Sequence, residues 1–290
     1  MILLILSIIL SSSLVLLFKW FGKFNLDTLQ ILVSNYWTCV ICATLYTGKF
    51  PLNAGLIHEE WFLFTVMMGF FFITGFYSAA KTIEIAGVSV TSVMQKMSLL
   101  ILVAYTTYFY HESLNFIKIL GLLAAIGAIF LSASGGKSLE NQQNKNLLAI
   151  IFPIATLILG GGVDICIFEV QKSFPQLSGN AGFIGVLFGM AGIMGVTILI
   201  FRYFAYKKGL DKRSWLAGIL LGIPNFFSIV TLLGALNMGW EGSVVFPINN
   251  VGVIAFATIV AWLLLGEKLN TKKIASILLS ILAILLIAFS

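Results

Sequence analysis

The sequence predicts an all-α integral membrane protein with ten transmembrane helices arranged as a 5+5 inverted repeat. Three observations lead to this fold class. Sixty per cent of the 290 residues are hydrophobic and only 10% are charged, which is too few charges to cover the surface of a soluble domain. Apolar runs of about 18 residues or more recur along the chain. Finally, the two halves of the chain share a sequence pattern.

Each apolar run is long enough to cross about 30 Å of hydrocarbon as a helix. The expected spans are residues 2–18, 28–48, 61–80, 88–110, 115–134, 147–168, 181–201, 214–236, 243–265 and 273–289. The first span lacks a basic leader and a small-x-small cleavage site, so we expect a retained helix rather than a signal peptide. The polar stretches between the spans are too short for a soluble domain.

The basic residues between the spans fall into two unequal groups. Loops after odd-numbered spans contain Lys19, Lys23, Lys81, Lys137, Lys145, Arg202, Lys207, Lys208, Lys212, Arg213, Lys268, Lys272 and Lys273. Loops after even-numbered spans contain only Lys49, Lys118 and Lys172. Because basic loops favour the cytoplasm, this distribution places both termini outside it. Because the basic residues lie mainly in loops and form no basic face elsewhere, the expected surroundings are a lipid bilayer, and no nucleic acid is expected as a partner.

An internal repeat is the most specific feature of the sequence. Residues 75–133 align without a gap with residues 230–288, which places Gly87 on Gly242 and Lys118 on Lys273. At the centre of the match, Glu112-Ser-Leu-Asn115 aligns with Glu267-Lys-Leu-Asn270. This polar elbow joins two long apolar helices in each half.

The repeat divides the chain into a first five-helix unit (1–136), a linker (137–146) and a second five-helix unit (147–290). A weaker match, Leu10-Ser-Ser-Ser13 against Leu159-Gly-Gly-Gly162, pairs the first span with the sixth. Five is an odd number, so the second unit must be inverted in the bilayer relative to the first. Inverted repeats are typical of secondary transporters, in which two halves rock around a central site.

These features together resemble the drug/metabolite transporter superfamily, EamA type. The resemblance is carried by the ten helices, the inverted repeat and the two elbows, Glu112-Ser-Leu-Asn115 and Glu267-Lys-Leu-Asn270. It implies secondary transport through a central cavity lined mainly by the first, third, fourth, sixth, eighth and ninth helices. Members of this family usually place both termini in the cytoplasm, whereas the loop charges here predict the opposite orientation.

Lys96 is the clearest candidate for a substrate-binding residue. It lies about nine residues into the fourth span, and a charge near the centre of a bilayer costs on the order of 3 kcal/mol or more. One interpretation is that Lys96 faces the cavity and binds a carboxylate or phosphate of the substrate. The alternative is a buried ion pair with Asp164 that holds two helices together.

Asp164 follows Gly160-Gly161-Gly162 in the sixth span. Consecutive glycines let a helix loosen, or let a substrate approach the backbone, so Gly161 is a candidate for gating. We expect Asp164 either to carry a coupling proton or to act as a fixed counter-ion.

Amides and prolines supply the remaining candidates. Asn250 occupies the repeat position of Gln95, so the two amides should face the cavity from opposite halves. The alternative is hydrogen bonding between helices. Pro247 and Pro224 remove backbone donors and should kink the ninth and eighth spans. The further candidates beside them, and on the third helix, are Asn249, Asn225 and Tyr77.

Several features of the sequence argue against catalysis and against a bound metal or cofactor. Cys39, Cys42 and Cys166 lie within spans at no metal-binding spacing, and no nucleotide-binding loop or nucleophile elbow occurs, so no cofactor or metal is expected. Glycines spaced by three or four in the seventh span predict close packing, within the bundle or against a second copy, so the chain is a monomer or homodimer.

The sequence therefore predicts a secondary active transporter in the cell (inner) membrane. It would export or exchange a small polar metabolite, such as an amino acid or organic anion, by alternating access, with protons as a further partner. The alternatives are a lipid-modifying membrane enzyme, which would need a polar cluster at one interface, and a non-transporting accessory subunit, which would need no central lysine and amides.

Overall fold

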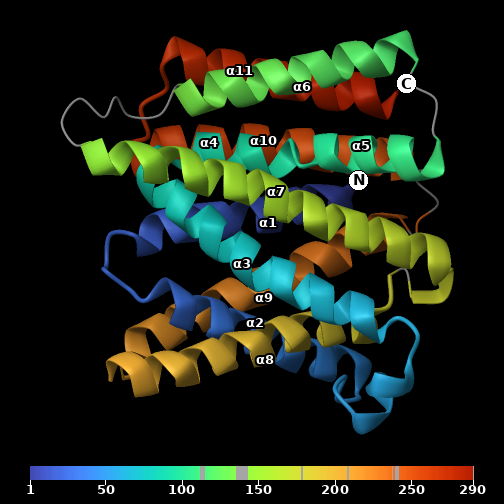
Figure 1. The fold of residues 1–290 in the computed structure, drawn as a ribbon, viewed down its shortest axis with the longest axis vertical. Coiled ribbons are helices and arrows are strands. Elements are labelled where there is room, and N and C mark those ends of the chain that lie inside the picture. Colours follow the sequence, from blue (N-terminus) through green and yellow to red (C-terminus); the bar gives the residue numbers. More distant parts are fainter. Residues whose placement is uncertain are drawn as a thin grey trace.

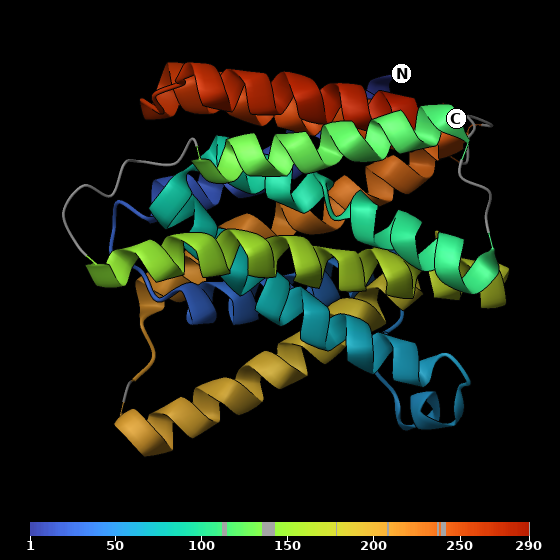
Figure 2. The same cartoon turned by 45° about the horizontal axis from the view of Figure 1, so that its top comes forward.

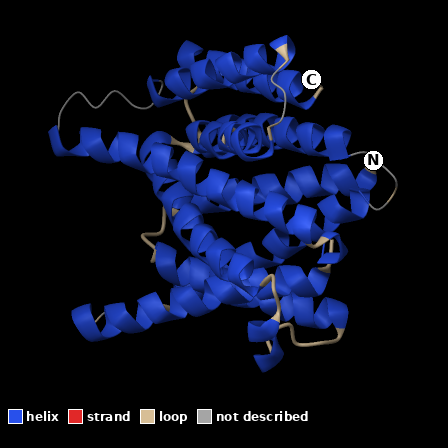
Figure 3. Cartoon of the chain, turned by 45° about the vertical axis from the view of Figure 1, so that its right-hand side comes forward, coloured by secondary structure: helices blue, strands red, loops and turns tan. Residues whose placement is uncertain are grey.

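The computed structural model is helical in nearly all of the residues that it describes, which are 1–111, 115–134, 143–177, 179–207, 209–236, 238 and 242–289. The helices run across the view in Figure 1, and Figure 3 shows that the described elements are helices joined by loops. Nine described segments are long and apolar enough to span a membrane, and the shorter apolar stretch Phe116–Leu131 adds a tenth. The predicted all-α membrane fold is confirmed.

The helices are α1 (Ile2–Phe21), α2 (Thr28–Thr47), η1 (Ala54–His58), α3 (Phe62–Ala86), α4 (Val88–Lys96), α5 (Leu99–Tyr110), α6 (Phe116–Ser134), α7 (Gln143–Ser173), η2 (Pro175–Leu177), α8 (Ala181–Tyr206), α9 (Lys212–Leu236), α10 (Gly242–Leu265) and α11 (Thr271–Ala288). We call the end of the bundle that carries both chain termini the terminal face (Figure 1). The opposite end, at which α1, α3, α6, α8 and α10 end, is the basic face.

The helices pack in a reciprocal pattern. The first helix, α1, packs against α9 and α10, and the sixth span, α7, packs in the same way against α3 and against α4 with α5. The pairs α2 with α8 and α6 with α11 link equivalent helices of the two halves, and α6 and α11 lie side by side in Figures 1 and 2. This exchange of partners is the pattern expected of two equivalent five-helix units. The unit boundaries at 136 and 147 stay a prediction.

The fourth predicted span is not one continuous helix. It divides into α4 and α5 at Met97 and Ser98, where the hydroxyl of Ser98 donates a hydrogen bond of 2.7 Å to the carbonyl of Gln95. This bond accompanies the break, because a side chain that bonds a carbonyl competes with the main-chain ladder. The span predicted over residues 88–110 is therefore confirmed as Val88–Tyr110, and two turn residues divide its helix.

The repeated elbow has a structural reason in its asparagine. Asn115 accepts a hydrogen bond from the backbone N–H of Lys118 at 2.8 Å, and Asn270 accepts one from Lys273 at 2.9 Å. Each asparagine therefore caps the first turn of the last helix in its half, α6 or α11.

The glutamate of the second elbow reaches into the other half of the chain. Glu267 accepts hydrogen bonds from the backbone N–H groups of Val88 (2.8 Å) and Ser89 (3.2 Å) and from the Ser89 hydroxyl (2.7 Å). Glu267 also forms an ion pair with Lys273, whose Nζ lies 3.0 Å from Oε1. Glu267 thus caps α4 with a full negative charge, which the N-terminus of a helix favours. Its equivalent in the first half, Glu112, lies outside the described residues.

The glycines of the seventh span pack inside the bundle. A Cβ added at Gly185 would meet Ala43 and Pro51, one at Gly189 would meet Leu52, and one at Gly195 would meet Val33. All of these neighbours belong to α2 or to the chain that follows it. The glycine stripe on α8 therefore allows α2 to approach closely and leaves no need for a second copy to explain it.

Candidate functional site

A cavity of about 250 Å³ lies at the centre of the bundle. Its lining comes from α1, α3, α4, α7, α9 and α10, together with Ser98 between α4 and α5. These are the helices that the family resemblance implied. The walls combine aromatic rings, among them Phe71, Phe72 and Phe76, with a small set of polar side chains. Such a mixture is typical of small-molecule sites, where a few polar groups fix the orientation of the ligand.

Lys96 and Asp164 both line this cavity, from α4 and α7. Among the described residues, no ion pair within 4.0 Å joins them. The buried Lys96–Asp164 ion pair, which was the alternative to substrate binding, is therefore absent from this conformation. The direct partner of Asp164 is Ser98, whose hydroxyl donates to the carboxylate Oδ2 at 2.5 Å. The cavity thus holds one cation and one anion that are not in contact with each other.

The amides predicted from the repeat are placed unequally. Gln95 lines the cavity beside Lys96, whereas the lining contributed by α10 is Val253, and Asn250 is not part of it. Asn249 is buried and accepts a hydrogen bond of 3.1 Å from Ser7 on α1, so its amide links α10 to α1. The symmetric pair of amides expected from Gln95 and Asn250 is thus not brought together in this cavity.

Asn225 on α9 also lines the cavity and is bonded to a neighbouring helix. Its Nδ2 donates to Oδ1 of Asn35 on α2 at 3.1 Å, and Asn35 is fully buried with its own Nδ2 unpartnered. A donor left unsatisfied in an apolar interior is costly, so this pair is a place where a ligand or water would be stabilising.

The glycines before Asp164 are positions of close packing. In the continuous helix α7, a Cβ at Gly160 would lie 3.2 Å from Ser98, one at Gly162 2.7 Å from Phe71, and one at Gly161 2.6 Å from Ile101. These glycines let α7 approach α3 and the α4–α5 break, and so bring Asp164 next to Ser98.

Replacing Gly161 with alanine is expected to destabilise the protein by about 1–3 kcal/mol, since the added methyl group overlaps Ile101. The measurement is thermal unfolding of purified protein in detergent. Gly209→Ala is the matched control, because nothing lies within 4 Å of a Cβ at that position. Equal unfolding temperatures for the two variants would contradict the packing role of Gly161.

The remaining candidates lie away from the central cavity or beyond the description. Tyr77 on α3 lines a separate pocket near the basic face, with Lys81 Nζ 6.0 Å from its ring centre. Pro224 lies inside α9. Pro247 lies within the range of α10, but its side chain is outside the described residues.

The sequence analysis did not select Ser98, Ser11 or Ser228, although all three line the cavity. Serine is common in membrane helices, where its hydroxyl bonds the preceding turn, so no local pattern distinguishes a cavity serine from others. The repeat match of Leu10-Ser-Ser-Ser13 with Leu159-Gly-Gly-Gly162 was the one signal available, since it aligns Ser11 with Gly160, another lining residue.

A second pocket, of about 410 Å³, lies between the central cavity and the basic face. Phe18 and Ile83 belong to the linings of both, so these two side chains separate them. The outer pocket contains Lys19, Lys23 and the ion pair between Lys81 and Glu84, in which Nζ lies 2.8 Å from Oε2. The approach to the cavity from the basic face therefore carries a net positive charge, which attracts anionic groups.

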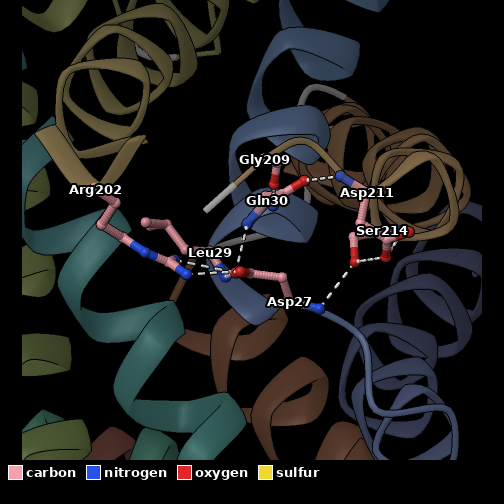
Figure 4. Close-up of polar contacts among 7 residues, drawn as sticks. All are labelled: Asp27, Leu29, Gln30, Arg202, Gly209, Asp211 and Ser214. Carbon is pink, nitrogen blue, oxygen red and sulfur yellow. Dashed lines mark hydrogen bonds and ion pairs between the residues drawn. The ribbon is translucent and has the colours of Figure 1, made fainter. Parts of the chain in front are cut away.

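A polar network fastens α8 to α2 at the basic face (Figure 4). The guanidinium of Arg202 makes two hydrogen bonds to Asp27, of 3.1 and 2.7 Å, and Asp27 also caps α2 through the N–H of Leu29. Bidentate pairs of this kind are the stronger ones. Arg202 and Asp27, together with Tyr77, line the pocket beside this network.

The same network includes the start of α9. Gln30 donates to the carbonyl of Gly209 at 3.0 Å and accepts from the N–H of Asp211 at 2.7 Å. The hydroxyl of Ser214 donates to Asp211 at 2.6 Å, and this hydrogen bond holds the pKa of the Asp211 carboxyl below its ordinary value. The network therefore fixes the N-termini of α2 and α9 to each other.

No group of three or more potential metal ligands occurs among the described residues. Cys39 and Cys166 are buried, and Cys42 is partly buried. The residues present offer hydrogen bonds and charges to a ligand.

This chain is similar to known proteins in sequence and in fold. The family model described as the EamA-like transporter family matches residues 170–289. An uncharacterized protein of Haemophilus influenzae is 25% identical over 289 residues, which is 97% of this chain and 95% of that protein. A protein of known crystal structure superposes with a TM-score of 0.60 at 13% identity, over 98% of this chain and 94% of the other, and therefore shares its fold.

Proposed function

We propose that this chain, whose residues 170–289 match the EamA-like transporter family, is an EamA-type member of the drug/metabolite transporter superfamily and a secondary active transporter of a small polar metabolite. It works by alternating access around the central cavity, in the cell (inner) membrane, as an exporter or exchanger. The transported molecule is an amino acid or an organic anion, and the driving force is a proton gradient or substrate exchange. The chain acts as a monomer or homodimer and is not an enzyme.

The observation that carries this proposal is that Lys96 and Asp164 line one cavity without forming an ion pair with each other. Two charges in an apolar bundle are costly unless each has a partner. A substrate with a carboxylate satisfies Lys96, and an ammonium group or a proton satisfies the free oxygen of Asp164. The phenylalanines of α3 then contact the apolar part of the substrate.

The size of the cavity limits the substrate. A volume of about 250 Å³ lies just below the range of about 300–1,000 Å³ that is typical of small-molecule sites. This size favours a small metabolite over a lipid, and so supports transport over the alternative of a lipid-modifying enzyme. An accessory subunit that transports nothing would not need a lysine and an aspartate in its central cavity.

The experiment is transport into vesicles that contain the purified full-length protein. A panel of radiolabelled amino acids and carboxylates, tested with and without a pH gradient and with internal substrate, identifies the substrate and the driving force. Protein-dependent transport of a panel member supports the proposal. Its absence for every class in both modes contradicts the proposal.

Replacing Asp164 with asparagine is expected to flatten the pH dependence of transport, because asparagine cannot bind or release a proton. Residual exchange of a carboxylate substrate should persist, since Lys96 is retained. The measurement is the initial rate of transport between about pH 5.5 and 8.5, with Glu84→Gln as control, whose carboxyl lies in the outer pocket. An unchanged pH profile would remove the proton-carrying role of Asp164.

A further inference from the structure

The two parts of the fourth span are held by very different amounts of structure. The first part, α4, packs against α1, α3, α6, α7, α10 and α11. Among the described residues, the second part, α5, packs extensively against α7, and its Leu100 also contacts the apolar cluster of α6 and α11. A half-helix with one extensive neighbour moves more easily than one embedded among six, since fewer packed contacts must be broken.

The break between α4 and α5 touches the central cavity. The hydroxyl of Ser98 has a single hydrogen and two acceptors within reach, the Gln95 carbonyl at 2.7 Å and the Asp164 carboxylate at 2.5 Å. Only one of these bonds can be fully formed at a time. A substrate ammonium or a proton that neutralises Asp164 weakens it as an acceptor, so Ser98 then bonds Gln95 alone. The geometry of the break is thereby linked to the occupancy of the cavity.

The far end of α5 is attached to α7 by a second contact, near the terminal face. Two phenols, those of Tyr105 and Tyr110, donate to the same carboxylate oxygen, Oε1 of Glu169, at 2.8 and 2.6 Å. Lys172 Nζ lies 3.2 Å from the ring centre of Tyr110, in a cation–π contact one turn further along α7. Asp164 and Glu169 thus hold the two ends of α5 from one helix.

We propose that α5 is the terminal-face gate of this transporter, that it pivots at Met97 and Ser98, and that Glu169 with Tyr105 and Tyr110 is the latch that keeps it closed. The inference rests on the proposed transport function. In this structure the outer pocket of the basic face adjoins the cavity, while the latch is closed at the opposite end, which is the arrangement that alternating access requires. Neutralising Asp164 loosens the pivot, and opening the latch exposes the cavity to the terminal face.

The test measures access to the cavity in the absence of substrate. The three cysteines are replaced by alanine, and Ser11, which lines the cavity, is replaced by cysteine as a reporter. Full-length protein in vesicles of known orientation is labelled with a membrane-impermeant maleimide from the terminal face. Tyr105→Phe with Tyr110→Phe keeps both rings and removes both donated bonds. Tyr108→Phe, on the exposed side of α5, is the matched control.

The double variant is expected to label at least about threefold faster than the parent, and the Tyr108→Phe control at the parental rate. Equal rates for the double variant and the parent, or an equal rise in the control, would overturn the proposal. Glu169→Gln keeps an acceptor oxygen without its charge and should give an intermediate rise. If the double variant does not fold, the labelling rate of Glu169→Gln tests the proposal, and a rate equal to that of the parent would overturn it. Because labelling needs no substrate, loss of the gate is distinguished from failure of the transport proposal, which only the vesicle assay measures.

Discussion

Replacement of Lys96 with methionine is expected to reduce transport by about 10- to 100-fold without loss of folded protein. The side chain keeps its length and apolar stem but loses the ammonium group that faces the cavity. A hydrogen bond to a charged group contributes about 1.5–3 kcal/mol, and each 1.4 kcal/mol corresponds to roughly a factor of ten. The measurement is the initial rate of substrate uptake or exchange in vesicles, normalised to the reconstituted protein.

Two comparisons make the Lys96 result specific. Lys49→Met, in the loop after α2 and far from the cavity, should transport as the parent does. Lys96→Arg retains the charge on a larger group and should retain part of the activity. If Lys96→Met transported at the parental rate, the cavity charge would have no role in binding, and the substrate class proposed above would be wrong.

Replacement of Glu267 with alanine is expected to cause the largest loss of stability, about 3–5 kcal/mol, because it leaves a buried Lys273 without its partner. Glu267 and Lys273 are both buried, at 6% and 8% exposure, so solvent cannot replace the lost contact. The N-terminus of α4 loses its cap as well. Unfolding of the purified protein in detergent, followed by heat or denaturant, measures the effect.

The same carboxylate makes stability depend on pH. Burial raises the pKa of Glu267, but the charge of Lys273 and the hydrogen bonds from Ser89 outweigh it, so the folded pKa lies below the ordinary value. A lowered pKa means that Glu267 stabilises the fold above the unfolded value of about 4.3, and that this contribution is lost as pH falls through the folded pKa. The difference in stability between the parent and Glu267→Gln should therefore shrink below about pH 4.

The control for Glu267 is Glu84, whose carboxylate belongs to a partly exposed ion pair. Glu84 makes an ion pair with Lys81 in which both side chains are partly exposed, so Glu84→Ala should cost less than about 1 kcal/mol. The double variant Glu267→Ala with Lys273→Met removes the stranded charge and should recover part of the lost stability. If Glu267→Ala were no less stable than Glu84→Ala, the interaction with α4 would not be a stabilising one.

Most of the fold follows from the sequence because the bilayer imposes a simple rule. Every apolar run of sufficient length must form a helix to satisfy its backbone, so the ten spans and their order could be predicted directly. The break at Met97 and Ser98 could not, because the fourth span contains neither proline nor glycine at that point. The hydroxyl of Ser98 at this break also bonds Asp164, which lies 66 positions away in the sequence.

The candidate site was predictable in its charges and less so in its amides. Lys96 and Asp164 were found because a charge in an apolar run has few explanations. Asn249 and Asn225 carry no comparable signal, since an amide serves equally well in a cavity or between helices, and here they bond Ser7 and Asn35. The pairing of Gln95 with Asn250 assumed equal depth and equal rotation, but a small difference in helix rotation moves a side chain from the cavity to a packed face.

The cap that Glu267 supplies to α4 makes each half of the chain incomplete by itself. Residues 1–136, produced alone, would have a fourth helix with exposed N–H groups at its start, and the missing carboxylate would have to arrive on a separate fragment. A chain cut in the linker should consequently assemble only when both pieces are made together. A substitution at position 267 should likewise change which residues are tolerated at positions 88 and 89.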